Sequence, residues 1–326
     1  MNVETAELLK EIWDRKAVEG TADRLRPHVR RTPLKSSDEL NRRLGCKLFL
    51  KCENRQHSGS FKFRGACHAL LSLSAEDRHR GVLTASSGNH GAALALAGQL
   101  MDSSVWVVVP ENAAKTKIRN IERFGARIFF CGPRIEDRET TLSELRAQSG
   151  RRVIPPYNDP KVILGQATTG LEIIEQGGEF DAVIAPVGGG GLMSGTVIAF
   201  KTHAPATRLI GAEPCGADDA YRSLQAGRII PSSQPETVCD GLLTSLGDLT
   251  FPILQRGLEK IVRVADADTL EAMDWVGDAL QMSIEPSSAI TLAAALQLRE
   301  ELAGSRVALI LSGGNTAAKA PKQATR

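Results

Sequence analysis

The sequence predicts an α/β protein with two open, mainly parallel twisted sheets flanked by helices. Short apolar, β-branched runs alternate with segments of helical periodicity along the 326 residues. This rhythm is typical of parallel strands with helices on both faces. Three strand-to-helix loops, at residues 86–91, 188–191 and 312–315, are rich in Gly, Ser and Asn. Loops of this kind meet at the carboxyl ends of parallel strands, where ligands bind.

The predicted elements follow one another in a regular order after an amphipathic N-terminal helix at residues 1–16. The expected strands are Lys47–Lys51, Val82–Ala85, Ser104–Val109, Arg127–Phe130, Ala182–Pro186, Arg208–Glu213 and Arg306–Leu311. The expected helices are Gly91–Met101, Thr116–Phe124, Asp137–Gln148, Gln166–Gln176, Met193–Lys201, Ala267–Ala279 and Ala289–Glu301. Residues 317–326 are expected to form a frayed tail. At about 150 residues per domain, the length predicts two domains.

Composition excludes several classes of partner. The formal net charge is +2, from 40 basic and 38 acidic residues. With no basic block or acidic tail, neither nucleic acid nor an anionic membrane is an expected partner. The N-terminus lacks the apolar run of a secretion signal, and no other apolar run could span a bilayer. The six cysteines form no CxxC pair, so we expect free thiols and a cytoplasmic location.

The run PVGGGGLMSG, residues 186–195, follows an apolar strand and opens a helix. Four consecutive glycines let the backbone approach an anion, and their N–H groups add to the positive end of the helix dipole. A tight strand-to-helix turn is the alternative, but it needs only one or two glycines. No GK[ST] follows, so this is not a P-loop. We therefore predict a phosphate cradle.

The run SGSFKFRGA, residues 58–66, places Lys62 between two phenylalanines at the start of a helix. Partial burial there would lower the pKa of the amine, as a nucleophile that forms a Schiff base requires. By itself, a Lys between aromatic residues is more often a surface residue with a buried stem.

Two further loops carry polar groups at the ends of strands. TASSGNHG, residues 84–91, offers hydroxyls, an amide and backbone N–H groups at a helix N-terminus, which suits a carboxylate. Helix capping by Ser87 or Asn89 is the alternative interpretation. LSGGN, residues 311–315, adds a hydroxyl and two glycines.

Taken together, these motifs resemble the fold type II pyridoxal-phosphate enzymes, and within them the serine/threonine dehydratases and serine racemases. SGSFKFRGA, SSGNHG, GGGGL and SGGN stand in the order of that family, and the likeness extends from about residue 31 to residue 315. YNDPKVILGQATTGLEI (157–173) and EPCGADDA (213–220) also resemble its segments. The resemblance implies a large cofactor domain of residues 1–71 and 159–326 and a small mobile domain of residues 72–158, with the active site in the cleft between them.

The resemblance also implies how the cofactor, pyridoxal 5'-phosphate, is held. Lys62 would carry it as a Schiff base, and Phe61 would pack on the face of its ring. Asn89 would bond its phenolic oxygen, and Ser312 would meet the pyridine nitrogen. Its phosphate would lie on Gly188, Gly189, Gly190 and Gly191. A neutral hydroxyl at the ring nitrogen makes a weaker electron sink than an aspartate, which favours elimination over transamination.

The reaction implied is dehydration of a 3-hydroxy amino acid, such as serine, threonine or 3-hydroxyaspartate, to a 2-oxo acid and ammonia. Lys62 would remove the α-proton, and the acid that protonates the leaving hydroxyl is either Lys62 or the cofactor phosphate. Ser87 stands where serine racemase has its second acid/base, so a serine or aspartate racemase is the alternative. A non-catalytic phosphate- or nucleotide-binding protein is a third hypothesis, against which an intact Lys62 argues.

Substrate and metal residues complete the prediction. The substrate carboxylate would lie on Ser86, Ser87, Asn89 and His90, with Thr244 nearby. Arg138 aligns with an arginine of serine racemase that faces dicarboxylates, and would favour hydroxyaspartate. Pairing of Arg138 with a neighbouring Glu on its own helix is the alternative. By resemblance, Glu213, the Ala217 carbonyl and Asp219 would hold a structural magnesium or calcium ion, and the protein would be a homodimer.

Overall fold

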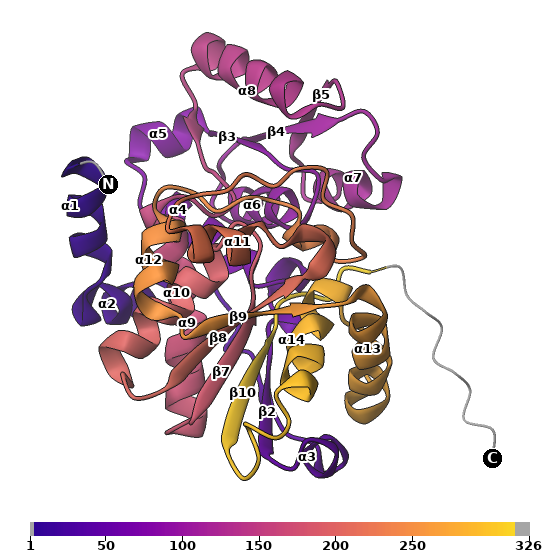
Figure 1. Cartoon of the computed structure of the whole chain (residues 1–326). Helices are drawn as coiled ribbons and strands as arrows, with labels where there is room; N and C mark the ends of the chain where they lie inside the picture. Colours follow the sequence, from indigo (N-terminus) through magenta and orange to yellow (C-terminus); the bar gives the residue numbers. More distant parts are fainter. Residues whose placement is uncertain (1–2, 317–326) are drawn as a thin grey trace.

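Two mainly parallel sheets form the frame of the protein (Figure 1). The computed structural model describes residues 3–316, so the expectation for residues 317–326 lies outside the described part. The larger sheet has the strand order β1-β2-β10-β7-β8-β9, with only β1 antiparallel to its neighbour. Its strands are β1 Leu34–Lys35, β2 Lys47–Cys52, β7 Ala182–Pro186, β8 Arg208–Pro214, β9 Lys260–Val264 and β10 Arg306–Leu311.

The smaller sheet is parallel throughout and has the order β5-β4-β3-β6. Its strands are β3 Val82–Ala85, β4 Val105–Pro110, β5 Arg127–Cys131 and β6 Arg152–Val153. They come from one stretch of the chain, between two stretches that build the larger sheet. The fold class predicted from the sequence is confirmed, whereas the proposed domain boundaries stay a prediction.

Helices cover both faces of each sheet (Figure 1). They are α1 Val3–Ile12, α2 Arg15–Leu25, α3 Asp38–Leu44, α4 Lys62–Leu71, α5 Ala75–Arg80, α6 Asn89–Leu100, α7 Lys115–Glu122, α8 Ile135–Ser149, α9 Pro160–Gly177, α10 Gly191–His203, α11 Asp219–Ala226, α12 Thr250–Gly257, α13 Asp266–Leu280 and α14 Pro286–Gln297. Short 3₁₀ turns are η1 Glu53–Arg55, η2 His57–Gly59, η3 Cys215–Ala217 and η4 Asp240–Leu242.

Along the central strands of the larger sheet, successive side chains point to opposite faces. Val183 and Ala185 of β7 pack with α1, α2, α9, α10 and α12 on one side. Ala182 and Ile184 point to the other side and pack with α3, α13 and α14. Because both faces are covered by helices, the central strands are apolar along their whole length. In the smaller sheet, one face packs against α4 and α6 and the other against α8.

The boundaries of some elements differ from the sequence prediction. Helix α9 begins at Pro160, six residues before the predicted start, because the Asp159 carboxylate caps it by accepting from the Lys161 and Val162 N–H groups. Strand β9 was not predicted, since the edge strand KIVRV carries exposed charges among its apolar residues. Helix α14 ends at Gln297, whereas the prediction continued to residue 301.

No helix in residues 3–316 is long and apolar enough to cross a membrane. All six cysteines are free, and only Cys215 among them is exposed. This agrees with the thiols expected from the sequence.

Candidate active site

The segment that carries Lys62 is tied to the loop after β10. Ser58 and Gly59 both adopt positive φ, at 59° and 77°, so the chain turns sharply before α4. The Phe61 N–H donates to the Ser312 carbonyl at 3.0 Å, and the Gly314 N–H donates to the Gly59 carbonyl at 3.0 Å. These two hydrogen bonds hold the segment 58–66 beside the loop 311–315, although the two motifs lie far apart in the sequence.

The Lys62 amine is the first candidate for chemistry. Its side chain is partly buried, and Nζ donates to the Pro156 carbonyl at 2.8 Å. Nζ also lies 5.0 Å from the centre of the Phe61 ring. Burial lowers the pKa of Lys62 to about 8. No carboxylate in residues 3–316 pairs with the amine, so a substantial fraction is neutral near physiological pH and can act as a base or nucleophile.

The four-glycine loop joins β7 to α10 and is fully buried. Within the described residues, none of the N–H groups of residues 188–191 donates to a protein acceptor. Buried N–H groups without acceptors are rare, and here they lie at the positive end of a 13-residue helix. Such a group of donors fits a phosphate.

Packing explains why glycine stands in this loop. Gly190 caps α10 in the left-handed conformation, with φ of 86°. A side chain at Gly189 would collide with the Tyr157 ring, and a Cβ at Gly188 would come within 2.9 Å of the Leu242 backbone. The loop backbone therefore carries no Cβ atom on the side that Tyr157 contacts.

Asn89 is the first residue of α6 and connects the two halves of the structure. Its side-chain Nδ2 lies 2.9 and 3.0 Å from the carboxylate oxygens of Glu285, which precedes α14. Its Oδ1 accepts from Asn315 Nδ2 at 2.8 Å. The predicted cofactor ligand Asn89 is therefore held by two residues on the side of the larger sheet.

The remaining residues of the 86–90 loop differ in their surroundings. Ser86 Oγ accepts from the N–H groups of Gly88 and Gly91, at 3.3 and 3.2 Å, and so shapes the loop. The half-buried Ser87 hydroxyl has no hydrogen-bond partner in the described part of the chain. His90 Nε2 is 3.0 Å from the Ile154 carbonyl, and burial lowers the pKa of His90 to about 3, with the charge of Lys62 as a smaller cause. His90 is therefore neutral and a neighbour of Lys62.

Ser312 ends β10 beside the Lys62 segment and is buried. Its Oγ is 3.1 Å from Ser288 Oγ, while Ser288 also donates to the Gly313 carbonyl at 2.7 Å. Among the described residues, the hydroxyl therefore bonds only neutral groups.

Arg138 and Thr244 both act on the phenol of Tyr157. Burial raises the pKa of Tyr157, and the Arg138 charge and the Thr244 hydroxyl both lower it, which places these two residues near the phenol. Arg138 is partly buried and forms no ion pair with any carboxylate in residues 3–316. At the start of the same helix, Arg134, which precedes α8, forms an ion pair with Asp137.

The three residues assigned to a metal lie at the end of β8. The Glu213 carboxylate accepts from the N–H groups of Ala220 and Tyr221, both at 2.8 Å. Both carboxylate oxygens of buried Asp219 lack a hydrogen-bond partner among the described residues. Burial raises the pKa of Glu213 to about 8 and of Asp219 to about 6. No group of three or more His, Cys, Asp or Glu side chains in residues 3–316 could hold a metal, so a cation here would need the Ala217 carbonyl and water.

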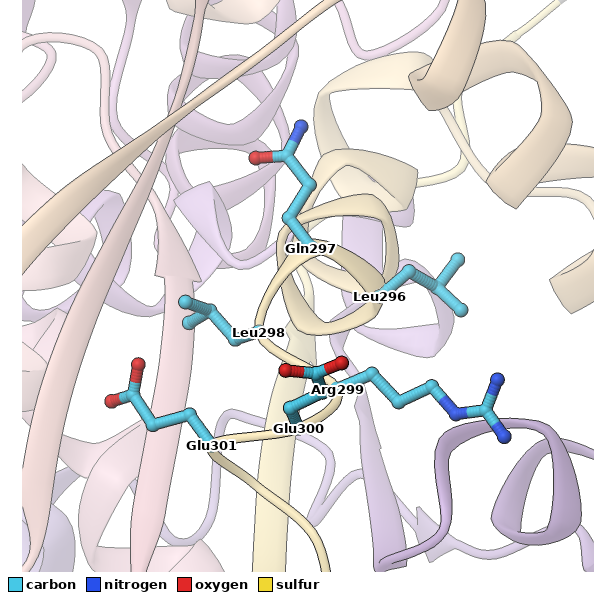
Figure 2. Close-up of a pocket in the computed structure, with 6 residues that line it drawn as sticks. All are labelled: Leu296, Gln297, Leu298, Arg299, Glu300 and Glu301. Carbon is cyan, nitrogen blue, oxygen red and sulfur yellow. The ribbon is translucent and has the colours of Figure 1, made fainter.

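A hollow of about 440 Å³ lies elsewhere, at the carboxyl end of α14 (Figure 2). It is lined by residues 296–301, none of which is a predicted site residue. Glu301 at its edge forms an ion pair with Lys260 at 2.6 Å. We assign no function to this hollow.

Three residues of the site were missed by the sequence analysis. Glu285 and Asn315 bond Asn89, and Tyr157 packs on the glycine loop. An acidic residue before a proline at a helix start is an ordinary capping pattern, so Glu285 carried no distinctive signal. Asn315 and Tyr157 stood inside motifs that had been recognised, but nothing in the sequence showed which side chains they contact.

Comparison with known proteins identifies the family of this chain. Residues 25–313 match the family described as pyridoxal-phosphate dependent enzyme. A β-hydroxyaspartate dehydratase of Paracoccus denitrificans is 45% identical over 90% of this chain and 93% of its own. A serine racemase of Arabidopsis thaliana is 43% identical over 90% of both chains. The crystal structure of a serine racemase from Dictyostelium discoideum is 41% identical, with a TM-score of 0.90 over 94% of this chain and 99% of its own. The chain belongs to the family of pyridoxal-phosphate-dependent enzymes.

Proposed function

We propose that the protein is an ammonia-lyase that converts a 3-hydroxy amino acid, preferentially 3-hydroxyaspartate, to a 2-oxo acid and ammonia. The observation that carries the proposal is that the fold holds both a Lys62 amine of lowered pKa and four glycine N–H groups that have no acceptor among the described residues. The likeness to a β-hydroxyaspartate dehydratase supports the class of substrate.

The residues present fit pyridoxal phosphate. Lys62 would hold it covalently, the N–H groups of residues 188–191 would bind its phosphate, and Phe61 would pack on its ring. Asn89 and Ser312 would meet its phenolic oxygen and ring nitrogen. When bound, the cofactor supplies the electron sink that permits loss of the substrate α-proton.

Lys62 would handle the proton at the α-carbon. A neutral amine is a competent base, and a pKa near 8 leaves it able both to take and to return a proton near neutral pH. His90 is neutral beside it and adds no positive charge that would repel the protonated amine. Proton transfer to the leaving hydroxyl is assigned either to Lys62 or to the cofactor phosphate.

Two separate groups would hold the two carboxylates of hydroxyaspartate. The loop of Ser86, Ser87, Asn89 and His90 lies at the positive end of the 12-residue helix α6, which suits the α-carboxylate. Arg138 has no ion-pair partner among the described residues, so its guanidinium is available to the side-chain carboxylate. Arg138 and Thr244 both act on the phenol of Tyr157. Serine and threonine lack that second carboxylate.

A substrate panel tests this proposal. The wild-type protein, Arg138→Ala and the control Arg134→Ala are each given L- and D-serine, threonine and the isomers of 3-hydroxyaspartate, and 2-oxo acid is measured. Loss of two charge-assisted hydrogen bonds should lower kcat/KM for hydroxyaspartate about 100-fold in Arg138→Ala, with little change for threonine. Arg134 is exposed and paired with Asp137, so its removal should have little effect. Equal losses on hydroxyaspartate and threonine would refute the role of Arg138.

Racemisation is the second candidate activity. It is favoured by the likeness to serine racemases and by the Ser87 hydroxyl, which no described residue engages. Ser87 and Lys62 would then serve as acid and base on opposite faces of the substrate. The enantiomer ratio of recovered serine and aspartate tests it, because Ser87→Ala should abolish inversion while elimination continues. A pure binding protein is excluded if a visible cofactor band appears and is lost in Lys62→Ala.

We also propose that magnesium or calcium binds Glu213, the Ala217 carbonyl and Asp219. Two buried carboxylates, one of them without a hydrogen-bond partner among the described residues, suit a hard divalent cation. A cation at about 100 times its Kd would add about 2.7 kcal/mol to the free energy of unfolding. Magnesium and calcium should raise the Tm of the wild type and leave that of Asp219→Asn unchanged. No rise in the wild type with either ion would overturn this site.

The homodimer and the cytoplasmic location remain proposals from sequence resemblance and cysteine usage. Light scattering should give twice the 35.0 kDa of one chain. A mass of 35.0 kDa at micromolar concentration would contradict the dimer.

A further inference from the structure

Within the described part of the chain, Glu285 is a buried carboxylate that forms no ion pair. Its side chain is 6% exposed, and no Lys, Arg or His in residues 3–316 forms an ion pair with it. Its oxygens instead accept from Asn89 Nδ2 at 2.9 and 3.0 Å and from the Asn315 N–H at 2.8 Å. Burial raises the pKa of Glu285, while the bonds from Asn89 and Asn315 lower it. Burial of a carboxylate without a neutralising cation destabilises the fold, so a functional role is expected for a carboxylate kept in such a place.

The Glu285 carboxylate decides which way the Asn89 amide points. A carboxylate only accepts hydrogen bonds, so it selects the NH₂ end of the amide and repels the carbonyl end. Asn315 Nδ2 only donates, and at 2.8 Å it selects the carbonyl end of the same amide. The two contacts agree on one orientation, so Asn89 is fixed at both ends.

This arrangement leaves one side-chain N–H of Asn89 without an acceptor among the described residues. The two Glu285 oxygens lie at nearly equal distances from Nδ2, so a single hydrogen pointing between them serves both. The second hydrogen of the NH₂ group points away from the carboxylate and has no acceptor among the described residues. It remains available to a ligand.

The glycines of two motifs make room for the same network. A Cβ at Gly313 would come within 3.0 Å of Glu285 Oε2, and a side chain at Gly59 would collide with Asn315 Oδ1. Both glycines lie in the segments that flank Lys62 and Ser312. The close packing of these segments thus accommodates the buried carboxylate and its amide partners.

We propose that Glu285 is a positioning residue of the cofactor site, which orients Asn89 so that its free N–H is presented to the phenolic oxygen of pyridoxal phosphate. The inference rests on the proposed function, in which Asn89 binds that oxygen. A donor at this position stabilises the phenolate form, whereas a rotated amide would turn its carbonyl oxygen toward it. Glu285 therefore acts on the cofactor through Asn89.

Glu285→Gln tests this role at nearly constant volume. The glutamine amide can donate as well as accept, so it no longer selects one orientation of Asn89. We expect the dissociation constant of pyridoxal phosphate to rise about tenfold, the size of effect of one lost hydrogen bond. We also expect the visible band of the lysine-bound cofactor to weaken at a given pH, because its phenolate loses a donor.

Two further variants separate positioning from stability. Asn315→Ser leaves Glu285 in place but removes the donor to Asn89 Oδ1, so it should change the spectrum in the same direction. Asp248→Asn is the matched control, because the Asp248 carboxylate accepts from the Asn158 side chain at 2.6 Å and makes no bond to Asn89. It should leave the spectrum and cofactor affinity at wild-type values. The melting temperature is recorded for every variant without cofactor.

The outcomes distinguish the two proposals. If the wild type takes up the cofactor, and both Glu285→Gln and Asn315→Ser keep its spectrum and affinity, the positioning role is overturned while the proposed function stands. A lower melting temperature alone in these variants would likewise overturn it, because it indicates a purely structural carboxylate. A wild type that shows no visible band with excess pyridoxal phosphate overturns the proposed function and this inference together.

Discussion

The Arg64 guanidinium lies 2.8 Å from the Glu53 carboxylate, and neither side chain is exposed to solvent. Arg64 also pairs with Glu172 of α9 at 2.7 Å, and Glu172 pairs with buried Lys51 of β2 at 2.6 Å. The cluster therefore joins η1, β2, α4 and α9. Because Arg64 stands two residues after Lys62, it fixes the turn of α4 that carries the reactive amine.

Removal of the Arg64 charge should destabilise the fold severely. In Arg64→Met, the Glu53 carboxylate would stay buried without its partner, at a cost of about 3–5 kcal/mol. Urea unfolding measures this loss. The exposed pair of Arg15 and Glu19 provides the control, since Arg15→Met should change stability by about 0.5 kcal/mol or less. A loss below about 1 kcal/mol in Arg64→Met would contradict the structural role of the cluster.

The lowered pKa of Lys62 makes the stability of the cofactor-free protein depend on pH. The amine has a pKa of about 8 in the fold and its usual 10.5 in the unfolded chain. Between these values the unfolded chain binds more protons, so the contribution of Lys62 to stability rises with pH across this window. Below pH 8 the folded state carries the full cost of a buried cation.

Lys62→Met should therefore stabilise the cofactor-free protein at pH 7. The advantage over the wild type should shrink as the pH rises from 8 toward 10.5, where the wild-type amine is neutral in both states. Denaturant unfolding at pH 7 and pH 9.5 measures the difference. An advantage that stays constant or grows with pH would show that the amine is not desolvated.

Gly189→Ala should impair the glycine loop through a collision with the Tyr157 ring. Overpacking of this kind costs about 1–3 kcal/mol, and relief by a backbone shift would move the N–H groups out of register with a phosphate. We expect a lower Tm and weaker retention of pyridoxal phosphate on gel filtration. Gly20→Ala, in α2 with no atom near the added Cβ, should instead be neutral or slightly stabilising. Equal behaviour of the two variants would argue against close packing at Gly189.

Much of the fold could be predicted from the sequence because its signals are local. The apolar runs of β7, β8 and β10 and the glycines after β7 are readable along the chain, and the strand at residues 182–186 agrees with its prediction. The start of α9 was misplaced because the pattern of apolar residues was followed and the Asp159 cap before Pro160 was not. Edge strand β9 was missed because its solvent-facing charges obscure the alternation.

The candidate site was predictable where a motif is contiguous and unpredictable where partners are distant. Lys62 and the glycine loop belong to dense local motifs, whereas the bond between Asn89 and Glu285 joins residues 196 positions apart. No local sequence pattern predicts such a pair, since Asn89 and Glu285 each resemble an ordinary helix cap. The suggested pairing of Arg138 with a glutamate of its own helix is absent among the described residues, and the ion pair at the start of that helix joins Arg134 and Asp137 instead.

Tyr157 offers a test of how the substrate pocket is built. Its ring packs on Gly189 and its Cβ and backbone on Gly191, while its phenol lies near the Arg138 charge and the Thr244 hydroxyl. Tyr157→Phe keeps the ring and removes only the hydroxyl. We expect the Tm to stay close to that of the wild type and kcat/KM for hydroxyaspartate to fall about tenfold, as for one lost hydrogen bond near the second carboxylate.

Tyr157→Ala separates the ring from the hydroxyl, because it leaves a cavity over the glycine loop. Loss of a large aromatic side chain should cost about 3–5 kcal/mol where it is well packed, and less at this partly buried position. Cofactor retention should fall in the alanine variant and not in the phenylalanine variant. If Tyr157→Phe turns over hydroxyaspartate at the wild-type rate while Tyr157→Ala loses the cofactor, the role of Tyr157 is limited to packing of its ring against the glycine loop. In that case the second carboxylate of the substrate depends on Arg138 without help from the phenol.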